Sequence, residues 1–234
     1  MFANDSLDTL DFGRVSLAPM IQEGATACHA AAHAVLSYAL GFGVESVSVG
    51  VTIGESEGQK TYTLRGEYRG NTARFNRLVP EGKDVAYSPI ILSADVIRAG
   101  GPAAERKYYI EQGAPNSTLG ASERDHDSID GVGRALQFYG SRNPFAYRRL
   151  VWRQAQAALE NETIRCAVTC LARELFDLFP ETDDLVEHNG TMRGKEAVAI
   201  VRAVGVKPGI LGFVAKNWTP TAPPSRRQRL ASPI

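Results

Sequence analysis

Two histidines four positions apart, His29 and His33, have a spacing suited to metal chemistry. They fall in an alanine-rich segment, residues 25–40, which we expect to be a helix that ends at Gly41. Residues i and i+4 of a helix lie one turn apart on the same face, so both imidazoles could bind one metal ion at about 2.0–2.1 Å. The alternative is that the two rings pack beside their neighbours without a metal.

The string His29-Ala30-Ala31-Ala32-His33 departs from the pattern His-Glu-x-x-His at one position that matters for chemistry. In zinc peptidases the glutamate of that pattern takes a proton from the metal-bound water. Ala30 stands at the glutamate position and has no group that can accept a proton. The sequence therefore predicts two metal ligands without the general base.

Four blocks of sequence carry a family resemblance, and they occur in the family's order. They are residues 28–49, with the histidine pair, Leu-Gly and a strand of Val-x-x-Val-Ser-Val type; Gly100-Gly101-Pro102-Ala103-Ala104-Glu105; Gly120-Ala121-Ser122-Glu123-Arg124-Asp125; and, more weakly, residues 190–196. Together they resemble the peptidase domain of the FtsH-type ATP-dependent zinc proteases over residues 20–205. The chain has no room for the ATPase module, so we expect a stand-alone domain.

The resemblance implies Zn²⁺ as cofactor, with His29, His33 and Asp125 as its ligands. This chain has one more residue before Asp125 than the common motif, so Asp127 is the backup ligand, and Asp130 and His126 also stay open. These acids could instead cap the helix that follows. Glu105 is expected to orient a ligand histidine or to pair with Arg98 or Arg106.

The implied activity is hydrolysis of peptide bonds by a zinc-dependent endopeptidase, with extended or unfolded protein segments as substrate. Such a segment could add to the strand predicted over residues 44–49. With Ala30 in place of the base, this chain is predicted to be inactive, either naturally or through a deliberate Glu→Ala change. The alternative function is a non-catalytic peptide- or protein-binding module on the same scaffold.

The expected fold is α+β and mainly helical: a zincin-like helical domain with a small β-hairpin or sheet and a C-terminal helix hairpin. Strands are predicted over residues 13–17, 44–49 and 61–64. Helices are predicted over residues 89–98 and 103–109, on either side of Gly100-Gly101-Pro102, and over residues 125–139, 144–179 with a break near Asn161, and 194–204. The expected parts are a lead-in (1–19), the peptidase-like domain (20–215) and a flexible, Pro-rich basic tail (216–234).

Composition narrows the partners and the compartment. Lys plus Arg equals Asp plus Glu at 26 each, which gives no reason to expect nucleic acid as a partner. No apolar run is long enough to span a bilayer, so no membrane association is expected. Three cysteines are too few for a disulfide framework, and Cys166 and Cys170 are predicted to be a buried, reduced pair in a cytoplasmic protein. A homo-oligomer stays open.

Overall fold

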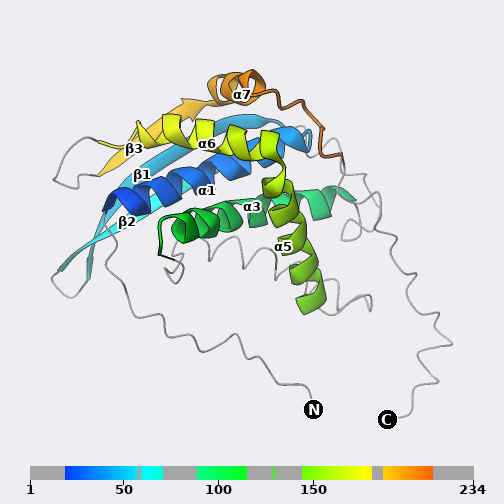
Figure 1. The fold of residues 1–234 in the computed structure, drawn as a ribbon. Coiled ribbons are helices and arrows are strands. Elements are labelled where there is room, and N and C mark those ends of the chain that lie inside the picture. Colours follow the sequence, from blue (N-terminus) through cyan, green and yellow to red (C-terminus); the bar gives the residue numbers. More distant parts are fainter. Residues whose placement is uncertain are drawn as a thin grey trace, which may run out of the picture.

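The computed structural model describes residues 19–56, 59–70, 89–114, 129, 144–180 and 187–212. These residues form an α+β fold, mainly helical, with five helices and one three-stranded antiparallel sheet (Figure 1). The predicted fold class is confirmed at this level. In chain order the elements are α1 (Pro19–Ala39), β1 (Val44–Ser56), β2 (Gln59–Gly70), α3 (Pro89–Glu111), α5 (Pro144–Glu160), α6 (Glu162–Phe176), β3 (His188–Arg193) and α7 (Gly194–Ala203).

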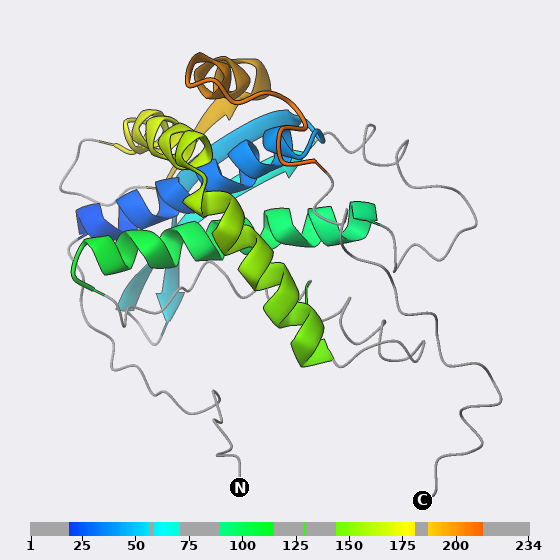
Figure 2. The same ribbon diagram turned by 45° about the vertical axis from the view of Figure 1, so that its right-hand side comes forward.

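Helix α1 is the centre of the molecule. Its alanines let other elements approach closely, and most of its residues from Ala25 to Leu40 are buried. The sheet packs on one side of α1, and α3 and α6 pack on the other, as the two ribbon views show (Figures 1 and 2). The chain turns sharply at Gly41, whose positive φ of 88° favours glycine. The predicted helix and its stop signal are thus confirmed.

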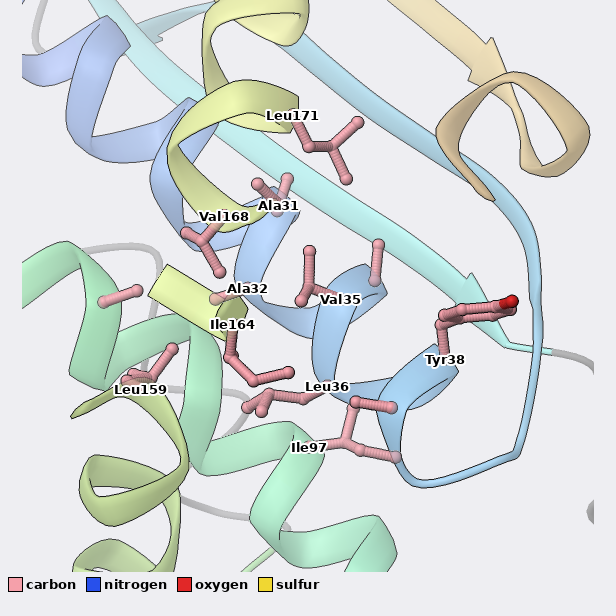
Figure 3. Packing of buried hydrophobic residues seen from close by; sticks show 14 of the residues in the cluster. Ala31, Ala32, Val35, Leu36, Tyr38, Ile97, Leu159, Ile164, Val168 and Leu171 are labelled. Carbon is pink, nitrogen blue, oxygen red and sulfur yellow. The ribbon is translucent and has the colours of Figure 1, made fainter. Parts of the chain in front are cut away.

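The core lies between these layers. Val35 and Leu36 of α1 meet Ile164, Val168 and Leu171 of α6 (Figure 3). Burying apolar side chains of this size stabilises the fold by about 1.5–3 kcal/mol each. This packing fixes the orientation of α1 and hence the direction in which its histidines point.

Strand β1 is the central strand of the sheet, in the order β2-β1-β3. It forms a hairpin with β2 in a register that runs from Val44↔Gly70 to Ser56↔Gln59, so both predicted strands are confirmed but are longer than predicted. The prediction that residues 44–49 could accept an added strand is wrong, because β3 pairs with β1 from Ser46↔Arg193 to Val51↔His188. His188 begins β3 and is half-buried.

Helix α3 runs without interruption through Gly100-Gly101-Pro102, where two separate helical pieces were predicted. The glycines serve packing against α1. A Cβ on Gly100 would lie 2.2 Å from Leu36 Cδ1, and a Cβ on Gly101 would lie 2.3 Å from His33 Nε2. The pair therefore allows the backbones of α3 and α1 to approach closely.

Helices α5 and α6 meet at Asn161, as predicted, and the Asn161 side chain accepts a hydrogen bond from the Ile164 amide at 3.2 Å. The expected helix hairpin takes another form, because α6 leads away from α5 and packs on α1, while α5 packs on α3 (Figure 2). The predicted apolar face of α6 is buried. Cys166 and Cys170 lie on its opposite, exposed face, so the prediction that they are buried is wrong.

Some of the remaining sequence predictions are confirmed, and others concern residues outside the described ranges. Helix α7 agrees with the helix predicted over residues 194–204, and Gly205 follows it with φ 99°. Of the helix predicted over residues 125–139, only Ile129 is described, and it is helical and buried. The strand predicted over residues 13–17 lies outside the described residues. None of the described helices is both long and apolar enough to cross a membrane.

Candidate metal centre

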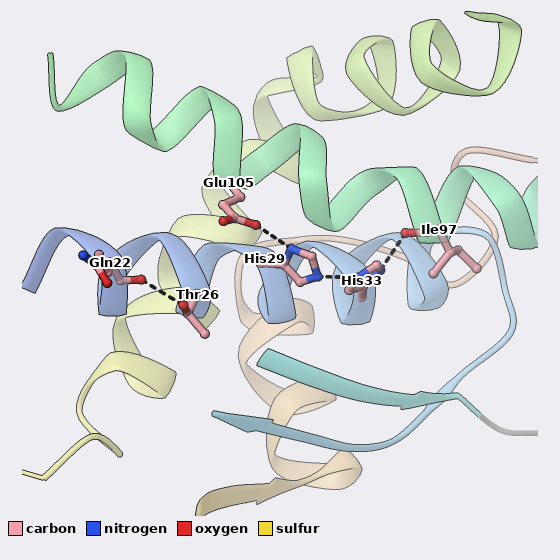
Figure 4. Close-up of polar contacts among 6 residues, drawn as sticks. All are labelled: Gln22, Thr26, His29, His33, Ile97 and Glu105. Atoms are coloured by element: carbon pink, nitrogen blue, oxygen red, sulfur yellow. Dashed lines mark hydrogen bonds and ion pairs between the residues drawn. The ribbon is translucent and has the colours of Figure 1, made fainter. Parts of the chain in front are cut away.

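The imidazoles of His29 and His33 come together on the side of α1 that faces α3 (Figure 4). Their Nε2 atoms lie 3.0 Å apart, and the two rings meet edge to face at 74°. Both residues are buried, with 2% of His29 and 6% of His33 exposed. The helical spacing read from the sequence thus does bring two nitrogen atoms to one point.

The second nitrogen of each ring is held by an acceptor on α3. His29 Nδ1 lies 2.9 Å from Glu105 Oε2, and His33 Nδ1 lies 2.7 Å from the Ile97 carbonyl oxygen. A carbonyl oxygen only accepts hydrogen bonds, so His33 donates from Nδ1, and the Glu105 carboxyl oxygen is placed to accept a hydrogen bond from His29 Nδ1 in the same way. In neutral rings this leaves the lone pairs on the two Nε2 atoms, which face each other.

Two Nε2 lone pairs at this distance repel each other unless a positive charge lies between them. Either a proton shared by the rings or a metal ion bound to both supplies that charge. Two nitrogens bound to one tetrahedral zinc ion at about 2.0–2.1 Å lie about 3.3–3.4 Å apart, close to the observed separation. Metal-binding histidines also typically donate their other N–H to a carboxylate or a backbone carbonyl, as both rings do here.

Gly101 lets the backbone of α3 pass close to these two nitrogens. A Cβ at Gly101 would lie 2.3 Å from His33 Nε2 and 2.8 Å from His29 Nε2. The missing side chain therefore lets both rings lie against α3. The histidines and the two acceptors on α3 together fit a divalent cation such as Zn²⁺.

Ala30 faces away from solvent, toward strand β2. It is completely buried, and a Cβ on Gly66 would lie 3.2 Å from the Ala30 Cβ and 2.8 Å from the Thr26 carbonyl oxygen. Strand β2 thus passes close to α1 at this point and leaves little room for a longer side chain at position 30.

Tyr68 follows Gly66 on β2 and lies against the same helix. Its ring stacks on His33 with 6.1 Å between the centroids, and its hydroxyl donates to Ser37 and, at 3.2 Å, to the Gly43 carbonyl oxygen. Burial raises the pKa of Tyr68 to about 12, so the hydroxyl stays protonated near neutral pH. Tyr68 thus packs its ring beside His33 while its hydroxyl is held by Ser37.

The structure shows which of its predicted partners Glu105 contacts. The candidates for the third metal ligand lie outside the described residues. Glu105 contacts His29, as one of its predicted roles required, while Arg98 pairs instead with Asp95 at 2.6 Å. Asp125, Asp127, Asp130 and His126 all lie outside the described residues. Among the residues that are described, no group of three His, Cys, Asp or Glu side chains is placed to hold a metal. His29 and His33 form a pair there.

Two parts of this arrangement were missed in the sequence. The Ile97 carbonyl has no side-chain signature, because any residue supplies it. Gly101 is visible in the sequence as part of the glycine pair at residues 100–101, but the local pattern indicated a break in the helix and not a close contact with the histidines. The chain matches no family model, and the curated proteins compared with it give no match either.

Proposed function

We propose that this chain is a zinc-binding domain of the FtsH peptidase type that cuts no peptide. The observation that carries the proposal is the convergence of the His29 and His33 Nε2 atoms, with each Nδ1 held by an acceptor on α3. The resemblance of the four sequence blocks supports the family, and the close approach of α3 to both rings at Gly101 is consistent with the metal. Asp125 is the proposed third ligand, with Asp127 as the backup and Asp130 less favoured.

A zinc ion bound here would polarise a carbonyl group and lower the pKa of a water molecule. His29 and His33 would hold it, and Glu105 would keep the His29 ring in the tautomer that binds. The general base is missing at Ala30. General acid–base help is worth about 10²–10⁴ in rate, and a methyl group supplies none of it.

Metal content tests the proposal. We expect about one zinc per chain after zinc loading and removal of excess metal, measured by mass spectrometry of the protein. His29→Ala and His33→Ala should each lose this zinc, whereas His188→Ala, on β3, should keep it and serves as the control. Asp125→Ala should lower the zinc content more than Asp127→Ala.

The contrary result is also clear. If the unaltered chain binds no divalent cation, either as purified or after zinc loading, the metal proposal fails. The Nε2 contact would then be a shared proton.

A second candidate function, a non-catalytic domain that binds extended protein segments, is favoured by one observation. Ala30 is completely buried against the close crossing of β2 at Gly66, which is the packing expected where a small residue is native. An extended segment would add to the outer edge of β2, because within the described residues β2 pairs only with β1.

Restoring a glutamate separates a native alanine at position 30 from one introduced into an active peptidase. If the small residue is native, Ala30→Glu should keep zinc, lower the melting temperature and cut no reduced, alkylated protein substrate. Ala31→Glu, at the next buried position, controls for the effect of burying a carboxylate. Zinc-dependent cleavage by Ala30→Glu alone would favour the peptidase with an introduced alanine.

A further inference from the structure

A groove that does not include the histidine pair lies where the start of α1, the end of α3 and helix α6 meet, on the left side of the ribbon in Figure 1. Its volume is about 670 Å³, within the range of about 300–1,000 Å³ typical of ligand sites. Leu159, Val168 and Phe176 contribute apolar surface to it. Met20, on the first turn of α1, also lines it and is 68% exposed.

The charged side chains that line the groove are mostly basic. Lys107, Arg165 and Arg173 are on its walls, against one acid, Glu111. Lys107 pairs with Glu160 at 2.9 Å. Neither Arg165 nor Arg173 forms an ion pair within the part of the chain that the structure describes. The groove therefore suits an occupant with apolar side chains and negative charge.

The first 18 residues of the chain have this composition. They contain Asp5, Asp8 and Asp11 against one basic residue, Arg14, and their apolar residues include Phe2, Leu7, Leu10, Phe12, Val15 and Leu17. This segment joins α1 at Pro19, next to Met20 on the wall of the groove. Covalent attachment at that point gives the segment a high effective concentration there.

We propose that residues 1–18 bind in this groove, with apolar side chains against its floor and aspartates near Arg165 and Arg173. The proposal does not depend on the metal site. It makes the segment an internal ligand that covers the surface between α1, α3 and α6.

All three cysteines of the chain line the groove, and they provide the measurement. Cys166 and Cys170 are exposed on α6. Cys28 is more buried than these two residues. A reagent reaches a buried thiol less easily, so Cys28 should react slowly and labelling should report on the α6 pair.

The test is the rate at which N-ethylmaleimide labels Cys166 and Cys170 in the native full-length chain, followed by mass spectrometry. In a Leu7→Ser, Leu10→Ser, Phe12→Ser variant we expect labelling to accelerate several-fold, because the apolar contacts that hold the segment are lost. An Asp5→Asn, Asp8→Asn, Asp11→Asn variant should also accelerate it, and the increase should shrink at high salt. None of the substituted residues is on α6, so the local sequence around both thiols is unaltered.

The matched control is Arg226→Gln, Arg227→Gln, Arg229→Gln near the other end of the chain, which should label at the native rate. Circular dichroism and the melting temperature must show that each variant is folded. Equal rates in the native chain and both segment variants would overturn the proposal. Protection that disappears on dilution of the native chain would also overturn it, by identifying a second copy as the occupant.

Discussion

At the scale of single residues, the histidine pair depends on a position that has no side chain. Gly101 lies opposite both Nε2 atoms, and its missing side chain lets both rings lie against the backbone of α3. An alanine in a helix interior is normally favoured over glycine by about 1 kcal/mol. A substitution that should help the helix is therefore expected to harm the site.

We predict that Gly101→Ala loses zinc binding. Its Cβ would lie 2.3 Å from His33 Nε2, which forces the ring away from His29. Gly100→Ala is the matched control, because its Cβ meets the end of the Leu36 side chain at 2.2 Å and should lower stability while zinc is kept. Zinc titration and thermal unfolding of both variants check this. Equal zinc affinity in the two variants would contradict it.

A second residue-scale prediction concerns Asp95, a completely buried acid on α3. Burial raises its pKa above the usual 3.8, although hydrogen bonds from Tyr147 at 2.5 Å and Arg98 at 2.6 Å act in the opposite direction. The folded state thus holds this proton more tightly than the unfolded state does. The contribution to stability is complete below the usual pKa and is lost as the pH rises through the raised folded pKa.

Asp95→Asn should remove this dependence. We expect the free energy of unfolding of the variant to increase relative to that of the native chain as the pH rises from about 4 to 7, because only the native chain loses stability through Asp95. Urea unfolding with a chelator present measures it without the contribution of metal. A difference between the two proteins that is constant over this range would show that Asp95 does not titrate as inferred.

At the scale of elements, periodic patterns predicted helices well. The apolar residues of α6 follow the helical period, and five of them, Ile164, Ala167, Val168, Leu171 and Leu175, are buried as expected. The break at Asn161 was predictable because asparagine is a common N-cap. It is also the place where α5 and α6 separate to pack on different helices.

We predict that Asn161→Ala lowers the free energy of unfolding by about 1 kcal/mol, because the Ile164 amide loses its acceptor. Asn161 is exposed, so no packing is lost with it. Asn161→Asp keeps an acceptor in place and should stay close to the native value. Chemical unfolding of the three proteins measures the difference, and an unchanged Asn161→Ala would show that the cap contributes nothing.

Elements that depend on contacts with residues far away in the sequence could not be predicted from local patterns. Strand β3 has the sequence His-Asn-Gly-Thr-Met-Arg, which has few strand-forming side chains, and it is a strand because β1 pairs with it. Because β3 was not predicted, residues 44–49 of β1 were wrongly expected to be free to accept an added strand. In α3, Gly100 to Pro102 indicated a break, and close packing against α1 outweighed that local preference.

At the scale of the whole molecule, the candidate site joins two layers. Both histidines are on α1, and the groups that hold their Nδ1 atoms are on α3. A cation bound by the rings would favour the arrangement in which these helices are packed. The sequence predicted that His29 and His33 lie together, and contact with a ligand histidine was one of the alternatives predicted for Glu105. The packing of the layers depends on the whole chain and could not be predicted in this way.

We therefore predict that zinc stabilises the fold. With free zinc about 1,000-fold above its dissociation constant, the gain is about 4 kcal/mol if the unfolded chain does not bind it. The melting temperature should rise on zinc addition and return to the metal-free value with a chelator. His29→Ala should show neither change. An equal response in this variant would place the bound zinc elsewhere.

The central position of β1 also has a consequence during synthesis of the chain. β1 and β2 are adjacent in sequence and can form their hairpin early, whereas β3 leaves the ribosome only after α3, α5 and α6. Until then the side of β1 that pairs with residues 188–193 presents open hydrogen-bonding groups. A nascent or truncated chain that ends before β3 would carry this edge uncovered, and its aggregation would be driven by the same groups that complete the native sheet.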